Sequence, residues 1–199
     1  DKEILQNREK FLKQASIDLN NTALIAVDYS TDNFSKYFYM NSSGKFTINN
    51  DVNNIPSSDG LTTMSPHLGI FLPLADCLGV VLYDDIQKIL MVVHAGRHNL
   101  KENGLIKAVE FMKKYGAKCT QIKAWLSPSA GEDNYPLYDF DNKSLEKVAR
   151  EQLNSVGVNN IISADIDTTK DNNYYSHSQG DSDKRHAILA YIVPLDDNE

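Results

Sequence analysis

The chain has 199 residues, a formal net charge of −7, 41% hydrophobic residues and 24% charged residues. This composition predicts a single packed domain over residues 1–199 and excludes a disordered chain. Basic residues form no stripe and no segment has the length of a membrane-spanning helix, so neither nucleic acid nor a membrane is an expected partner. The polar amino terminus does not resemble a signal peptide and two cysteines make no disulfide framework, so a cytoplasmic location is expected.

The first part of the chain predicts one helix and a few short strands. Apolar residues recur at helical spacing over Glu3–Ala15. An apolar strand is expected at Ala23–Val27. Two short strands are expected at Lys36–Met40 and Lys45–Ile48, joined by a polar turn at residues 41–44.

Beyond residue 59 the signals for strands become stronger. The turn at Asp84-Asp85 predicts a hairpin between two of these strands. Because the strands come in runs with few helices between them, the pattern favours an α+β fold over a doubly wound parallel sheet. The expected strands are Gly60–Met64, Gly69–Leu74, Leu78–Tyr83, Ile89–His94, Gln121–Leu126, Asn160–Ala164 and Ala187–Val193.

Two amphipathic helices are expected among these strands. The first covers Gly104–Tyr115, where apolar residues share one face. The second covers Asn142–Leu153, with Asp141 as its expected N-cap and Gly157 beyond its end.

Two short phrases, Ala75-Asp76-Cys77 and His94-Ala95-Gly96, combine residues that carry chemistry. Each lies where an apolar strand ends, and adjacent strands would bring the thiol and the imidazole into one cleft. The histidine then either holds the cysteine as a thiolate nucleophile or shares a soft metal such as zinc with it. Asp76 would serve as an acid/base or orienting group. The structural alternative is a small buried Cys77 and a hydrogen-bonded core histidine at position 94.

Three segments, Asp59–Thr63, Leu74–Asp84 and Val93–Gly96, carry a more specific pattern. They resemble the laccase-domain family, whose members are also called polyphenol oxidase-like or multicopper oxidoreductase-like proteins and are understood as purine nucleoside phosphorylases. Weaker similarity extends to three further places. These are the residues Asn7-Arg8 in the first expected helix, Trp125–Ser129 with Tyr135, and Tyr175-Ser176-His177 followed by Arg185.

The resemblance implies a four-layer α/β/β/α sandwich with mixed sheets, as in a group once labelled cysteine hydrolases. It implies a zinc ion held by one cysteine and two histidines, with Cys77 and His94 matching two of the three ligands. The implied reaction is cleavage of the purine–ribose bond of adenosine, inosine, guanosine or methylthioadenosine, with phosphate as the second substrate. Adenosine deamination is a further implied activity. Arg8, Arg97, His177 and Arg185 would bind the substrate or the phosphate.

The chain departs from the family pattern at the first metal ligand. The family has Q-x-H-G where this chain has Ala26–Asp32, which contains no histidine; His67, His98, Asp28 and Asp76 are candidate replacements. Three hypotheses therefore stay open: a zinc-assisted purine nucleoside phosphorylase or nucleosidase, a metal-free hydrolase or amidase with Cys77 as nucleophile and His94 as base, and a degenerate non-catalytic binding protein. A multicopper oxidase would need many more histidines than the five in this chain.

Overall fold

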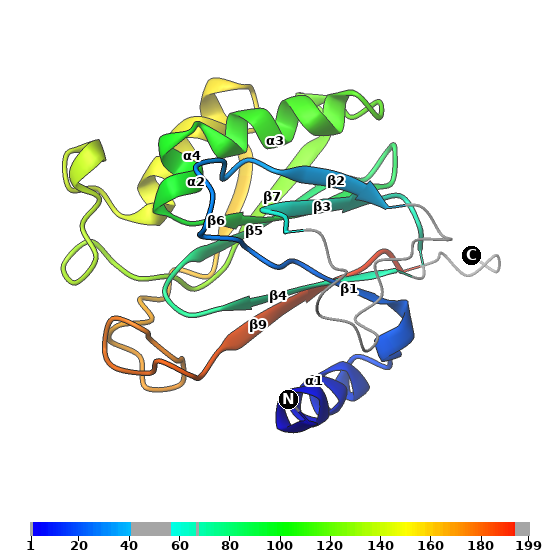
Figure 1. The fold of residues 1–199 in the computed structure, drawn as a ribbon. Helices are drawn as coiled ribbons and strands as arrows, with labels where there is room; N and C mark the ends of the chain where they lie inside the picture. Colours follow the sequence, from blue (N-terminus) through cyan, green and yellow to red (C-terminus); the bar gives the residue numbers. More distant parts are fainter. Residues whose placement is uncertain (1, 41–56, 67, 194–199) are drawn as a thin grey trace.

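The computed structural model describes residues 2–40, 57–66 and 68–193. Within these ranges the chain forms an α+β fold with two mixed sheets and four helices (Figure 1), as the run of strands predicts. The strand expected at Lys45–Ile48 and the turn before it lie outside the described residues. None of the described helices is long and apolar enough to cross a bilayer.

The larger sheet has six strands in the order β2-β3-β6-β5-β7-β8. Its outer pairs, β2–β3 and β7–β8, are parallel, and the pairs between them are antiparallel. The β5–β6 hairpin is confirmed, and the Asp84 carboxylate closes its turn by accepting the backbone N–H of Ile86 at 3.0 Å. The strands are β2 (Tyr37–Met40), β3 (Gly60–Thr63), β5 (Leu78–Asp84), β6 (Ile89–Ala95), β7 (Ile122–Leu126) and β8 (Asn160–Ser163).

The smaller sheet contains β1 (Thr22–Leu24), β4 (Gly69–Leu74) and β9 (His186–Ala190), with β4 in the centre. It lies against one face of the larger sheet (Figure 1). The chain passes from β4 in the smaller sheet to β5 in the larger sheet through residues 75–77. The strands that precede Cys77 and contain His94 are therefore not neighbours in one sheet, and the cleft forms between two sheets instead.

Helices flank the two sheets on their outer sides (Figure 1). The helices α2 (Arg97–Lys101), α3 (Gly104–Lys113) and α4 (Leu145–Ser155) cover the larger sheet, and α1 (Lys2–Gln14) packs on the smaller one. The short helix α2 was not expected from the sequence.

The predicted N-cap of α4 is wrong, because Ser144 and not Asp141 caps this helix. The Ser144 hydroxyl accepts the backbone N–H of Lys147 at 3.3 Å. Asp141 instead has a left-handed backbone with φ of 53°, where it ends a short 3₁₀ turn. Gly157 follows α4 with φ of 86°, as expected for a residue beyond a helix end.

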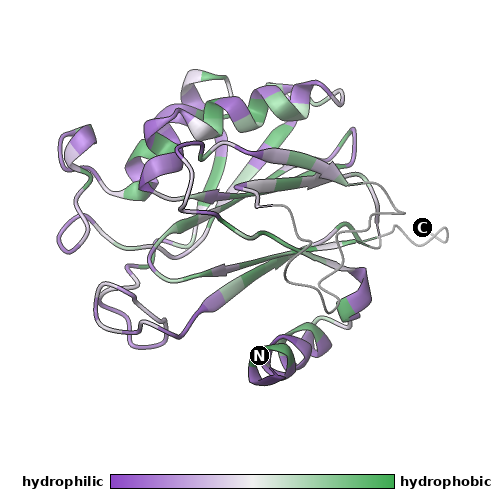
Figure 2. Cartoon of the chain, viewed as in Figure 1, coloured by the Kyte–Doolittle hydropathy of each residue, from purple (hydrophilic) through white to green (hydrophobic). Residues whose placement is uncertain are grey.

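Apolar side chains fill three separate clusters. One lies between the larger sheet and its helices and includes Leu105 and Leu153; another lies between the two sheets and includes Leu72 and Val92. The third, under α1, contains Leu12, Leu24 and Phe71. Figure 2 shows the apolar strands inside and the hydrophilic outer faces of the helices. All seven residues of β6 are buried, which explains the nearly continuous apolar run that leads to His94.

Candidate functional site

The alternation of side chains along β5 and β6 brings Cys77 and His94 to the same face of the larger sheet. Gly79 lies opposite His94 in the β5–β6 pairing. Cross-strand partners share a face, and Cys77 precedes Gly79 by two residues, so both chemical groups point toward the smaller sheet. A Cβ atom on Gly79 would overlap Ile188 Cδ1 and lie 2.8 Å from Leu74 Cδ1, so the glycine lets side chains of the smaller sheet pack closely beside β5.

Gly96 borders the thiol and the imidazole at once. A Cβ atom on Gly96 would lie 3.3 Å from Cys77 Sγ, 3.4 Å from His94 Nε2 and 2.8 Å from His94 Cε1. The backbone of Gly96 is extended, with φ of −77°, and any residue can adopt it. The glycine is therefore needed for the close approach of these two groups and not for its conformation.

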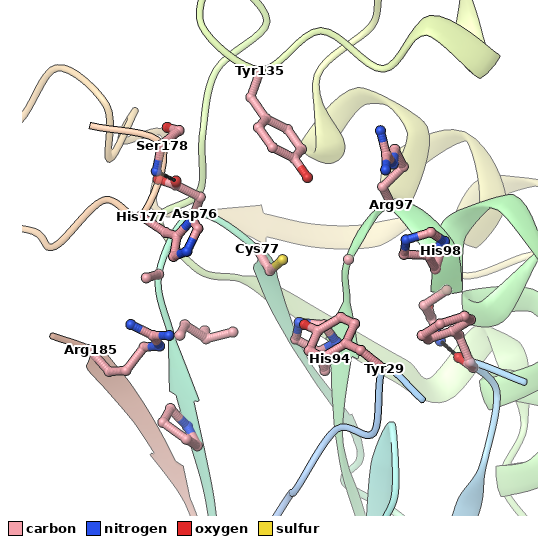
Figure 3. A pocket seen from close by; sticks show the side chains of 16 residues that line it. Tyr29, Asp76, Cys77, His94, Arg97, His98, Tyr135, His177, Ser178 and Arg185 are labelled. Carbon is pink, nitrogen blue, oxygen red and sulfur yellow. Dashed lines mark hydrogen bonds between the residues drawn. The ribbon is translucent and has the colours of Figure 1, made fainter. Parts of the chain in front are cut away.

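The thiol and the imidazole open into one cavity of about 320 Å³ at the end of both sheets (Figure 3). The predicted juxtaposition of the two groups is thus present in the structure. Segments far apart in the chain supply the walls of the cavity. The lining side chains that bear on the chemistry are Tyr29, Phe34, Asp76, Cys77, His94, Arg97, His98, Tyr135, His177, Ser178 and Arg185.

Burial keeps both central groups uncharged at neutral pH. Burial raises the pKa of the Cys77 thiol to about 11, and the nearby Asp76 carboxylate adds to this rise. Burial also lowers the pKa of His94 to about 4. No described residue hydrogen-bonds to the His94 ring, so nothing offsets the loss of hydration there. A thiolate–imidazolium pair, which a cysteine nucleophile requires, is therefore disfavoured in this environment.

Asp76 faces away from the thiol and fastens the carboxy-terminal loop (Figure 3). Its carboxylate accepts the backbone N–H of Ser178 at 2.7 Å and the hydroxyl of Thr168 at 3.0 Å. Burial raises the pKa of this carboxyl, but the hydrogen bonds from Ser178, Ser176 and Thr168 outweigh burial and hold the pKa below its ordinary value. The backbone of Asp76 is left-handed, with φ of 75°, which turns the chain sharply between the two sheets.

Three of the four predicted anion-binding residues lie at this cavity. Arg97 begins α2, and its guanidinium has neither a hydrogen bond nor an ion pair with any described residue. Arg185 donates to the backbone carbonyl oxygens of Ser182 and Lys184, and His177 lies near Arg185 (Figure 3). Arg8 is not brought to the cavity. It lies on α1 with its guanidinium 5.9 Å from the centre of the Phe71 ring, on the outer side of the smaller sheet.

The sequence did not single out two aromatic residues of the cavity, Tyr29 and Phe34. Both follow β1, and Tyr29 lies in the stretch Ala26–Asp32, where the family pattern would place a histidine. The Tyr29 ring meets His94 edge-on with centroids 6.5 Å apart, and Phe34 stacks on His98 at 4.5 Å. The aromatic content of residues 28–38 was the signal available for them.

The donors around the cavity do not complete a zinc site within the described ranges. Cys77 and His94 have the right chemistry and lie close together, but a catalytic zinc site normally has three protein ligands. No group of three histidine, cysteine or acidic side chains lies close enough to hold a metal among residues 2–40, 57–66 and 68–193. Asp76 is engaged by Thr168 and Ser178, and His98 stacks on Phe34. The candidate ligand His67 is outside the described residues.

Comparison with known proteins places this chain in a family. A purine nucleoside phosphorylase of Mycobacterium tuberculosis, Rv2149c, is 35% identical over 83 residues, 42% of this chain, and the match spans 33% of that relative's length. Purine nucleoside phosphorylase Cgl2154/cg2365 of Corynebacterium glutamicum is 25% identical over 162 residues, 71% of this chain and 66% of the relative. The chain therefore spans only part of these curated relatives.

The fold is shared with a solved structure, and a family model covers most of the chain. The crystal structure of the Bacillus licheniformis hypothetical protein YfiH superposes with a TM-score of 0.82 at 20% identity, covering 95% of this chain and 80% of YfiH. The model described as multi-copper polyphenol oxidoreductase laccase matches residues 1–143. The chain therefore belongs to this laccase-domain family, as the phrases around Cys77 and His94 indicated.

Proposed function

We propose that this protein cleaves the purine–ribose bond of a nucleoside, with phosphate as the attacking group, as a purine nucleoside phosphorylase. One observation carries the proposal: Cys77 and His94, which lie in the most specific phrases of the family, line one cavity together with Arg97 and Arg185. The names of the relatives in Mycobacterium and Corynebacterium support the same reaction class.

In the proposed reaction an oxygen of hydrogenphosphate forms a bond to C1′ of the ribose, and the C1′–N9 bond breaks with its electron pair moving to the base. The proton that the base takes up is supplied, in overall balance, by the hydrogenphosphate. Arg97 and Arg185 would hold this anion through their guanidinium N–H groups. Positive charge fixed at one cavity in a chain of net charge −7 would favour binding of an anion there.

Cys77 and His94, both in their uncharged forms, would bind and orient the sugar. A neutral His94 can donate one hydrogen bond and accept another, and the protonated thiol of Cys77 is a weak donor. Asp76 would act as a positioning residue, because its carboxylate fixes the Ser178 end of the loop that carries His177. Arg8, on the far side of the smaller sheet, has no part in this arrangement.

Zinc bound by Cys77 and His94 stays a prediction. A metal there would supply an activated water, which is the chemistry that the predicted deamination of adenosine needs. The described ligands are too few to support a step through it. The four-layer α/β/β/α arrangement, as in the group once labelled cysteine hydrolases, is likewise proposed, and the three apolar clusters support it.

A nucleoside assay with and without phosphate tests the proposal. We expect adenosine, inosine, guanosine or methylthioadenosine to be split only when phosphate is present, and activity to be lost in His94→Gln and Arg97→Gln. Cys119→Ala is the matched control for Cys77→Ala, because Cys119 lies in a separate 3₁₀ turn. Equal cleavage without phosphate would identify a nucleosidase instead. No cleavage of any purine nucleoside by the folded protein would refute the proposal and favour the degenerate binding protein.

Zinc and the cysteine hydrolase hypothesis are tested on the same samples. Elemental analysis of the purified protein and of Cys77→Ala measures whether zinc is bound and whether Cys77 holds it. Fast iodoacetamide labelling of Cys77 at neutral pH would favour the metal-free hydrolase, because only a thiolate reacts quickly.

A further inference from the structure

The aromatic side of the cavity is built by a segment that has no secondary structure of its own. Residues 25–36 connect β1 to β2 and form neither helix nor strand. This segment nevertheless brings Tyr29 and Phe34 to the cavity, where they meet His94 and His98. Its position must therefore be set by contacts with other parts of the chain.

Side chains from α2 and from the residue that follows it hold this segment in place. The Glu102 carboxylate accepts the backbone N–H of Phe34 at 2.9 Å and the hydroxyl of Ser35 at 2.7 Å. The Asn99 side-chain amide donates to the backbone carbonyl of Phe34 at 2.6 Å. Both backbone polar groups of Phe34 are thus paired with side chains more than sixty residues later in the chain.

The carboxylate of Glu102 is well suited to this contact. Its side chain is 24% exposed, and Lys107 approaches it at 3.3 Å. Burial raises the pKa of Glu102, but the hydrogen bonds from Phe34, Ser35 and Lys107 outweigh burial and keep the pKa below its ordinary value. A second carboxylate, that of Asp59, accepts the backbone N–H of Lys36 at 3.0 Å, so the segment is held at consecutive residues.

The rings that result from this anchoring form one wall of the cavity. The Phe34 and His98 rings stack with an interplanar angle of 20°, and the Tyr29 ring lies 6.1 Å from Phe34. Tyr29 is 64% exposed, so much of its ring surface is available to a ligand. Arg185 and His177 lie on the other side of Cys77, whereas Arg97 lies near His98 (Figure 3), so the aromatic side chains gather at one end of the cavity and each end has an arginine.

We propose that the base of the nucleoside stacks against the wall formed by Tyr29, Phe34 and His98, and that Glu102 is the positioning residue for that wall. This inference rests on the proposed function for the identity of the ligand. A purine is planar and aromatic, and such rings bind to aromatic side chains in stacked or edge-to-face arrangements. The ribose would then lie beside Cys77 and His94, between the base and Arg185.

The test measures binding of a free base separately from catalysis. Calorimetric titration with hypoxanthine gives its Kd for the parent and for the variants Phe34→Leu, Glu102→Ala and Glu102→Gln. We expect Phe34→Leu and Glu102→Ala to weaken binding about tenfold and Glu102→Gln to restore most of it, because glutamine keeps an acceptor for the Phe34 N–H. Glu110→Ala is the matched control, since the described partner of Glu110 is the exposed Lys113.

Kinetics and stability separate positioning from a general loss of structure. With inosine and phosphate, Glu102→Ala should raise KM for inosine about tenfold and leave kcat nearly unchanged, at a Tm close to that of Glu110→Ala. The inference is overturned when the parent binds no hypoxanthine, or when Phe34→Leu and Glu102→Ala bind it as the parent does. If hypoxanthine binds and depends on Phe34 but no nucleoside is cleaved, the proposed function fails and the base-binding wall stands.

Discussion

Replacing Gly96 with alanine should strongly reduce the activity of the site while leaving the fold intact. The added methyl group would lie 2.8 Å from His94 Cε1 and 3.3 Å from Cys77 Sγ, so at least one of these groups must move. Overpacking of this kind costs about 1–3 kcal/mol of unfolding free energy. In a chain of this length each kcal/mol lowers Tm by roughly 2–4 °C. Displacing a reacting group by about 1 Å costs on the order of 100-fold in rate, so kcat/KM should fall by that factor.

The assay compares this variant with a core variant of similar stability. Val109→Ala removes volume from the cluster between the larger sheet and its helices and should lower Tm by a similar amount. It should keep its activity, because Val109 is remote from the cavity. Thiol labelling adds a readout that does not depend on turnover: Cys77 in Gly96→Ala should react more slowly than in the parent. Full activity in Gly96→Ala, or an equal loss of activity in Val109→Ala, would refute the argument that Gly96 keeps space between the two groups.

Three further changes follow from the electrostatics of the site. The unfolded chain protonates His94 near its ordinary pKa of 6.5 and the folded chain near 4, so unfolding free energy should fall by up to about 3 kcal/mol as pH drops through that window. Urea denaturation of His94→Asn should show a weaker decline over the same range; an identical decline would contradict the assignment. The rate of Cys77 labelling should still rise with pH at pH 9, because its thiol titrates near pH 11. A labelling rate that reaches a plateau below pH 8 would mean that Cys77 is already a thiolate there, against the effect of burial. Asp76→Asn should expose residues 176–185 to trypsin sooner than the exposed-site control Asp183→Asn, and equal cleavage times would mean that the Ser178 contact does not hold the loop.

Local structure was largely predictable because its causes are local. The hairpin between β5 and β6 depends on two apolar runs and an aspartate turn, and all of these are visible in the sequence. The conjunction of Cys77 and His94 followed from their positions at strand ends. The N-cap of α4 was mispredicted because Asp141 and Ser144 are both good capping residues. Helix α4 starts later than predicted, and an antiparallel backbone bridge between Leu137 and Lys143 precedes it. No sequence pattern indicates this bridge.

The parts that were not predicted depend on contacts between distant segments. No pattern in the sequence indicates that β4 and β6 belong to different sheets, so the cleft was expected between neighbouring strands. Helical periodicity locates Arg8 on α1 but does not tell which side of the smaller sheet α1 covers. The aromatic wall was missed for the same reason, since Phe34 is positioned by Glu102, 68 residues later.

The cavity is lined by residues from position 29 to position 185, so it can form only after most of the chain has been synthesised. A chain still being synthesised cannot close this site, because Arg185 directly precedes β9, and β9 pairs with β4 only after more than a hundred further residues have emerged. Long-range pairing of this kind also slows folding. Ligand affinity should therefore report completion of the whole domain, and a fragment that ends at residue 143 should bind nothing at this position.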